Sequence, residues 1–163
     1  MFPGPENMAK ALRGVTDEMV EAGNGYKGWF QFGPHGDLVG QRTSQVGVDR
    51  AGAGSAKVEK LAEYGKVEPG SGLVPAQVSG QVDLAEGVGA RPAVAVALNG
   101  VIAGVSETFR EERDAQGSQP TGPPDKFSAM ALDTLFKKGD NRLELFVIDD
   151  SGGQVRLRPL TVS

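Results

Sequence analysis

The sequence predicts a mainly β protein, an antiparallel β-sandwich of the jelly-roll kind with one helix near the N-terminus. Apolar residues alternate with other residues within segments 91–105 and 137–150, which is the period of two that strands require. Asn99-Gly100 lies between two such runs, and this pair is a strong hairpin signal because both turn positions need a positive φ. The 24 glycines and 10 prolines imply many tight turns, as an all-β protein needs.

An amphipathic helix is expected near residues 7–22. Its apolar residues follow one another at intervals of four, three and four: Met8, Leu12, Val15 and Met19. Asn7 is a suitable N-cap, and the Gly-Asn-Gly at 23–25 is a stop signal.

The segment after the helix is the most aromatic of the chain. We expect a strand over 26–32, a turn at 33–36 and a short extended piece over 37–41. Residues 49–56 are rich in glycine and alanine, so a flexible loop is expected there.

Residues 57–64 have two interpretations. Val58, Leu61 and Tyr64 stand three apart, which suits one or two helical turns, and a partly alternating strand is the competing interpretation.

The second half of the chain is expected to supply most strands. Val78 and Val82 alternate with polar residues in a half-buried strand that has one face in water, and a hairpin follows over 92–109. Strands over 142–149 and 154–162 form a last hairpin. The core is expected to include Val96, Leu98, Phe136, Leu143 and Leu145.

We interpret residues 1–163 as a single domain. Residues 1–70 form a mixed helical and extended front segment that packs on the sandwich, and residues 74–162 form the sandwich core. Residues 110–125 are charged and then rich in glycine and proline, without an apolar anchor, so a mobile loop is expected there.

Composition narrows the function classes. A net charge of −4 and a pI near 5.1 disfavour nucleic acid and anionic membranes as partners. No apolar stretch reaches the roughly 18 residues of a membrane span, so no direct membrane insertion is expected. The start lacks the layout of a signal peptide, so the protein is either cytoplasmic or an excised part of a larger exported or membrane-anchored chain.

The catalytic inventory is small. There is no cysteine, and His35 is the only histidine, in a probable turn; a solvated turn histidine is favoured over a catalytic base. Asp149 and Asp150 are adjacent, so in a strand they point to opposite faces, and a hairpin turn is favoured over a glycosidase pair or a calcium site. Ser106 and Ser128 lack a nucleophile elbow. We therefore expect no catalytic residues, no metal site and no cofactor.

Trp29 is the one candidate ligand-binding residue. It lies in the aromatic stretch with Phe30 and Phe32, where flat rings could stack on a sugar. Aromatic residues in a strand are more often core anchors, and that interpretation is favoured.

Three stretches in order, VSGQV, AVAVALNGVIAGVSETF and FSAMALDTLFKKGDNRLELFVID, resemble a C-terminal extracytoplasmic β domain of actinobacterial membrane-anchored sulfatase-like proteins. Elements NG and GxN are also similar to those of galactose-binding-like jelly rolls. The matching residues are mainly turn and core positions: Val78, Gly80, Val96, Asn99, Gly100, Phe127, Leu135, Phe136, Gly139, Asn141, Leu143, Leu145 and Phe146. The resemblance covers about residues 74–149.

This resemblance implies a non-catalytic, outward-facing accessory domain whose parent protein carries the catalysis. Its partners would be a cell-envelope glycan or the neighbouring catalytic domain. An independent carbohydrate-binding module is the alternative, and a small secreted hydrolase is a third, weaker one.

Overall fold

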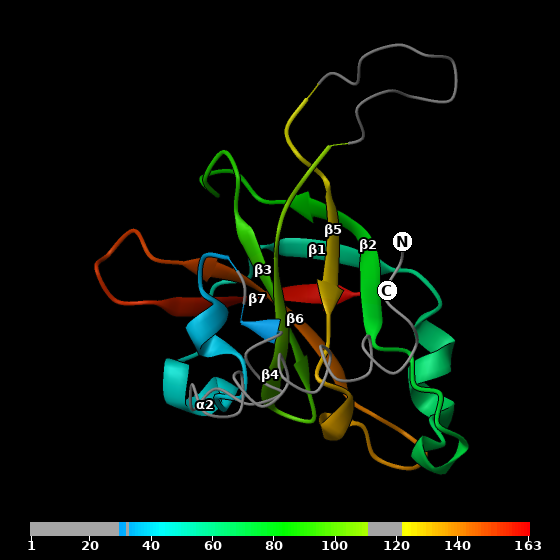
Figure 1. The fold of residues 1–163 in the computed structure, drawn as a ribbon. Helices are drawn as coiled ribbons and strands as arrows, with labels where there is room; N and C mark the ends of the chain where they lie inside the picture. The colour runs from blue at the N-terminus through cyan, green and yellow to red at the C-terminus, as the bar shows by residue number, and fades with distance from the viewer. Residues whose placement is uncertain (1–29, 32, 111–121) are drawn as a thin grey trace, which may run out of the picture.

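The computed structural model describes residues 30–31, 33–110 and 122–163, and in this part of the chain it shows a mainly β protein built on one seven-stranded sheet (Figure 1). The strands are β1 (Gly54–Val58), β2 (Gln77–Leu84), β3 (Ala93–Leu98), β4 (Val101–Glu107), β5 (Lys126–Met130), β6 (Leu143–Asp149) and β7 (Arg156–Val162). Their order across the sheet is β4-β3-β6-β7-β1-β2-β5. All neighbouring pairs of these strands are antiparallel except β1 and β7. The predicted fold class is confirmed.

The sheet curls until its two edge strands meet, so the two layers belong to one nearly closed barrel. The Leu132 N–H donates to the Ala103 carbonyl oxygen (2.9 Å), and Phe109 and Lys126 exchange two backbone hydrogen bonds. The Ser128 N–H donates to the Ser106 hydroxyl at 3.2 Å. Together these bonds tie β4 to β5 and to the segment that follows it.

A β-bulge in β4 lies at the contact between the two edge strands. Val96 pairs with Gly104 and the next residue, Ala97, pairs with Ile102, so Ala103 is the extra residue of β4. A Cβ at Gly104 would collide with the backbone carbonyl of Met130. Glycine at this position therefore allows the close approach of the two edges.

The described residues also form short helices: η2 (Gly36–Leu38) and α2 (Thr43–Val46) precede β1, η3 (Leu61–Lys66) and η4 (Pro69–Ser71) lie between β1 and β2, and η5 (Asp133–Leu135) lies between β5 and β6. The extended piece expected over 37–41 is wrong, because η2 occupies its first part. For residues 57–64 both interpretations hold in part, since β1 ends at Val58 and η3 begins at Leu61.

The flexible loop expected over 49–56 is also wrong, since β1 begins at Gly54. The small residues Gly54, Ser55 and Ala56 have weak strand preference, but pairing with β2 on one side and β7 on the other overrides it. Gly54 has a φ of 130°, and a Cβ there would collide with the Asp83 carbonyl oxygen.

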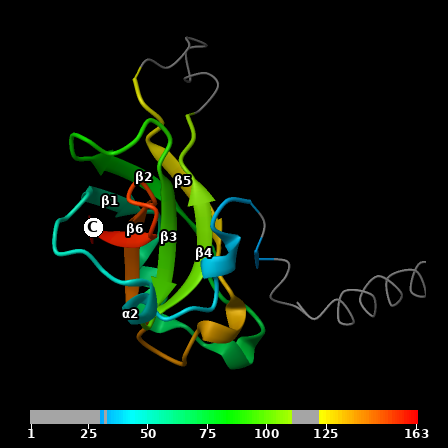
Figure 2. The same ribbon diagram turned by 90° about the vertical axis from the view of Figure 1, so that its left-hand side faces the viewer.

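The sheet buries apolar side chains on both of its surfaces. Inward-pointing residues of the strands fill the barrel, among them Val78, Val82, Val94, Val96, Leu98, Phe127, Leu145 and Leu160. A second cluster forms on the outer surface, where Leu38 and Val46 of the η2–α2 segment pack over Ala95, Phe146 and Leu157. Figure 2 shows the backbone of this segment on one side of the sheet, next to β3 and β4. Strand β3 is buried on both faces, because Val94, Val96 and Leu98 point inward and Ala93, Ala95 and Ala97 point outward. Of the expected core residues, Val96, Leu98, Phe136 and Leu145 are buried, and Leu143 is half-buried against the inner cluster.

A polar network fastens the β3–β4 turn to the segment before β6. Asn99 and Gly100 form this turn with φ of 54° and 83°, as predicted. The Asn99 Nδ2 donates to Asn141 Oδ1 (3.0 Å) and to the Leu135 carbonyl oxygen (3.3 Å). Asn141, 4% exposed, also accepts from the Lys137 N–H and donates to the carbonyl oxygens of Lys137 and Gly139.

Tyr64 connects this polar network to β2. Its hydroxyl donates to the Gln77 carbonyl oxygen (3.2 Å), its ring stacks on Phe136, and its carbonyl accepts from the Asn141 N–H (2.9 Å). Burial, and secondarily the charge of Glu63, raises the pKa of Tyr64 to about 12.

Some expectations fall outside the described residues. These are the helix near 7–22, most of the strand over 26–32, and residues 111–121 of the expected mobile loop.

Leu145→Ala is expected to lower the free energy of unfolding by roughly 2–5 kcal/mol, because it leaves a cavity in the barrel interior. Leu73→Ala is the matched control, since Leu73 is 81% exposed and its truncation should change stability by less than about 0.5 kcal/mol. Urea unfolding of both variants checks this, and equal losses would contradict the assignment of the core.

Asn99→Gly removes the side chain but keeps a residue that tolerates the positive φ, so it isolates the polar network from the turn. We expect Asn99→Gly and Asn141→Ala each to cost roughly 1–3 kcal/mol of unfolding free energy. The double variant should cost less than the sum by roughly 0.5–3 kcal/mol, because both changes remove the same bond. Strictly additive losses in urea unfolding would show that the two amides are not coupled.

Alkaline pH should reveal the protonated state of Tyr64. The folded protein keeps the phenol proton, whereas the unfolded chain loses it near the ordinary value of 10, so this contribution to stability is present below pH 10 and is lost between about pH 10 and 12. The free energy of unfolding should therefore fall more steeply with pH in the wild type than in Tyr64→Phe. Parallel curves for the two proteins would argue against the raised pKa.

Candidate functional site

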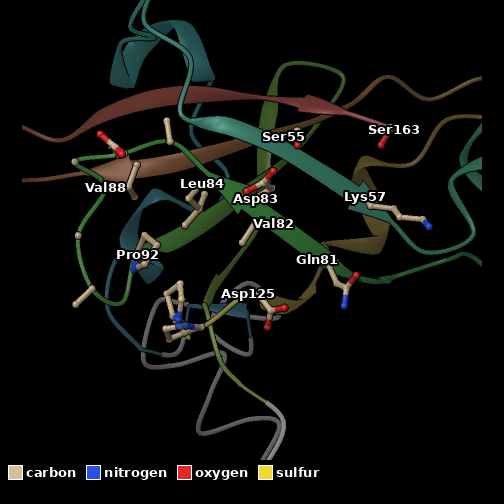
Figure 3. A pocket seen from close by; sticks show the side chains of 17 residues that line it. Ser55, Lys57, Gln81, Val82, Asp83, Leu84, Val88, Pro92, Asp125 and Ser163 are labelled. Atoms are coloured by element: carbon tan, nitrogen blue, oxygen red, sulfur yellow. The ribbon is translucent and has the colours of Figure 1, made fainter. Parts of the chain in front are cut away.

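A cleft of about 590 Å³ lies beside the C-terminal end of β2, and we call it the β2 cleft (Figure 3). Four segments distant in the sequence line it: β1, β2 with the loop 85–92 that follows it, residues 123–125, and Ser163. The Val82 N–H donates to the Asp125 carbonyl oxygen (2.7 Å), which holds residues 123–125 against β2. Strand pairing therefore builds this cleft.

The alternation of β2 decides which side chains reach the outer surface. Val78 and Val82 are buried in the barrel, whereas Gln77, Gln81 and Asp83 are exposed. The outward face was predicted as the wet face of a half-buried strand, and the structure confirms it. Polar contacts cross this face, where Gln77 Nε2 donates to the Ser128 hydroxyl (3.1 Å).

The strand register places one lysine on each side of Gln81. Lys57 of β1 pairs with Gln81, and Gln81 pairs with Lys126 of β5. Because neighbouring strands lie about 4.8 Å apart, the two lysine backbones are about 10 Å apart. Asp83 and Asp125 lie next to this row in the β2 cleft, so the site offers donors and acceptors of both charges.

The other end of the β2 cleft is mainly apolar, with the exposed carboxylate of Glu86 in the loop 85–92. Leu84 and Val88 are half-buried and pack against the inner core, and Pro92 is buried. Figure 3 shows Val88 and Pro92 at one end of the cleft and Lys57 and Ser163 at the opposite end. A ligand in this cleft would meet an apolar surface and a polar one together.

A second cleft of about 460 Å³ lies on the other side of the loop 85–92, and we call it the His35 cleft. His35 Nε2 is 3.5 Å from Asp150 Oδ2, and the His35 side chain is only 20% exposed. Residues 87–90 and Pro92 line both clefts, so the loop is their common wall.

The two adjacent carboxylates at the β6–β7 turn have different partners. Asp149 Oδ1 accepts hydrogen bonds from the Ser151 hydroxyl (2.6 Å) and the Ser151 N–H (3.1 Å). These bonds, with a smaller effect of the Arg158 charge, hold the pKa of the Asp149 carboxyl below its ordinary value. Asp150 instead faces His35. The hairpin-turn interpretation is confirmed.

His35 lies in a turn, as predicted, with a φ of 66°. It is less solvated than expected, and sequence reasoning missed its partner, Asp150. The two residues come from opposite ends of the chain, and no spacing rule connects them. Their shared place beside the β6–β7 hairpin could be found only from the fold.

The ligand-binding candidate of the sequence stays a prediction. Trp29 lies outside the described residues, as does Phe32, and Phe30 is half-buried. Within residues 30–31, 33–110 and 122–163, no three histidine or acidic side chains gather as metal ligands do. None of the helices in these ranges is long and apolar enough to cross a membrane.

Comparison of the chain with protein-family models, with curated proteins and with solved structures finds no match.

Proposed function

We propose that this chain is a non-catalytic accessory domain that binds a cell-envelope glycan in the β2 cleft. The observation that carries the proposal is the composition of this cleft, which combines an amide, carboxylates and an ammonium group with the apolar side chains of Leu84, Val88 and Pro92. Sugar hydroxyls both donate and accept hydrogen bonds, and sugar C–H faces are apolar, so a pyranose ring matches both kinds of group.

The location of the domain rests on the resemblance of residues 74–149 to the extracytoplasmic domain of sulfatase-like proteins. On that basis we propose a position outside the cytoplasm, within a larger membrane-anchored protein that carries the catalytic site. An independent carbohydrate-binding module is the alternative, and it would use the same cleft.

The hydrolase alternative receives less support from the His35 cleft. His35 has a carboxylate beside it, as a general base often has, but the Ser151 hydroxyl, which lines the same cleft, donates to Asp149. In this arrangement the proton of the hydroxyl is held by a carboxylate and not by the histidine.

An exposed apolar surface favours a second role, bracing a neighbouring domain. Leu73 is 81% exposed, and it borders a shallow groove that Ala62, Val67, Val74 and Pro75 also line. Large apolar side chains in such positions often mark contacts between domains.

Glycan binding is tested by titrating the protein with soluble peptidoglycan fragments and with arabinogalactan in a calorimeter. Gln81→Ala should weaken binding at least about tenfold, because it removes the amide at the centre of the lysine row. Gln154→Ala is the matched control, since Gln154 is exposed in the β6–β7 turn, away from β2 in Figure 1.

Two outcomes would contradict the proposal: no heat with either glycan, or an equal loss of affinity in both variants. Trp29 is the only tryptophan of the chain, so its fluorescence reports separately on whether it meets the ligand. Binding without a change in that fluorescence would agree with a site in the β2 cleft and would contradict a role of Trp29 in contacting the ligand.

A further inference from the structure

We propose that Asn99 is a latent site of spontaneous covalent modification, and that Asn141 keeps it unreactive in the folded protein. This inference is independent of the proposed glycan site. It rests on the chemistry of an Asn-Gly pair and on the hydrogen bonds that hold the Asn99 side chain.

The reaction is intramolecular and needs only water. The backbone nitrogen of Gly100 attacks Cγ of Asn99 and loses its proton, the bond from Cγ to Nδ2 breaks, and ammonia leaves. Water then opens the resulting five-membered imide at either carbonyl, giving aspartate or isoaspartate at position 99. Glycine is the most permissive following residue, because it has no side chain to hinder the attack and its backbone is the most flexible.

The fold opposes each movement that this reaction needs. The leaving nitrogen, Nδ2, is held by Asn141 Oδ1 at 3.0 Å and by the Leu135 carbonyl oxygen at 3.3 Å. Oδ1 accepts from the Arg142 N–H at 3.2 Å, and the Asn99 N–H donates to the Arg142 carbonyl oxygen at 2.9 Å. Rotation of Cγ toward the Gly100 nitrogen would break the three side-chain bonds at once.

Asn141 is the central member of this restraint because its own position is fixed. It is buried, accepts from the Lys137 N–H at 2.8 Å, and donates to two carbonyl oxygens of the same loop. Its Oδ1 therefore cannot turn away from Asn99 without leaving a buried donor unpaired.

The modification would not be reversed on refolding. A carboxylate at position 99 has no hydrogen to donate to the Leu135 carbonyl oxygen or to Asn141 Oδ1, so acceptors would face one another. Isoaspartate would also add a backbone atom to a two-residue turn. A transient opening of the loop before β6 would therefore be enough to leave a permanent aspartate or isoaspartate at position 99.

The test measures conversion at Asn99 by peptide mapping and mass spectrometry after incubation in mildly alkaline buffer. Folded wild-type protein should convert at least about tenfold more slowly than the same protein in urea, because three hydrogen bonds must open first. Asn24-Gly25 is an internal reference in urea, where both pairs belong to an unfolded chain and should react at similar rates. Equal rates at Asn99 in the folded and unfolded protein would overturn the proposal.

The role of Asn141 is tested with Asn141→Ala, under conditions where circular dichroism shows that it is folded. Its conversion at Asn99 should be faster than in the wild type, and an unchanged rate would overturn that role. Should this variant fail to fold, the wild type is incubated in urea below its unfolding transition. A rate that rises there with urea supports control by local opening, and a rate that stays flat overturns it.

Discussion

The hydrogen bond between the Asn99 and Asn141 side chains is the contact on which one end of the barrel depends, the end that carries the β3–β4 turn. It joins the β3–β4 turn to the segment that enters β6, and through Asn141 it reaches the carbonyl of Tyr64 in η3. Three segments distant in the sequence thereby share one polar centre beneath the apolar interior. Because a buried amide must satisfy both its oxygen and its nitrogen, this centre admits few arrangements of the surrounding backbone.

Closure of the sheet protects the edge strand β4 from pairing with other chains. A free edge strand offers unpaired backbone groups to other chains. Here the outer edge of β4 is covered near its start, where Gly40 and Gln41 bond to Ile102 and the Leu132 N–H bonds to the bulged Ala103, and Phe109, just after β4, bonds to Lys126. The segment that leads into β5, residues 123–125, lies beside β2 and supplies one wall of the β2 cleft.

Local patterns predicted much of the fold. The alternation within β2, β3 and β6 and the turn at Asn99-Gly100 were sufficient, because each depends on neighbouring residues. Strand β1 was missed, since Gly54 and its small neighbours carry little strand preference and gain their pairing only from distant strands. The clefts could not be predicted, because their walls come from segments distant in the sequence that meet only once the strands have paired. The His35–Asp150 contact was missed for the same reason.

The position of β7 has a consequence for how the protein is made. The last described strand lies in the middle of the sheet, between β6 and β1, and its parallel partner β1 is the first. A ribosome releases β7 after every other described strand, so the emerging chain has β1 and β6 but lacks the strand that joins them. The sheet is therefore completed only when β7 is available, from contacts between strands far apart in the sequence, and such topologies fold slowly. During that interval β1 and β6 each keep one edge without its native partner, the period in which the nascent chain most needs protection from association.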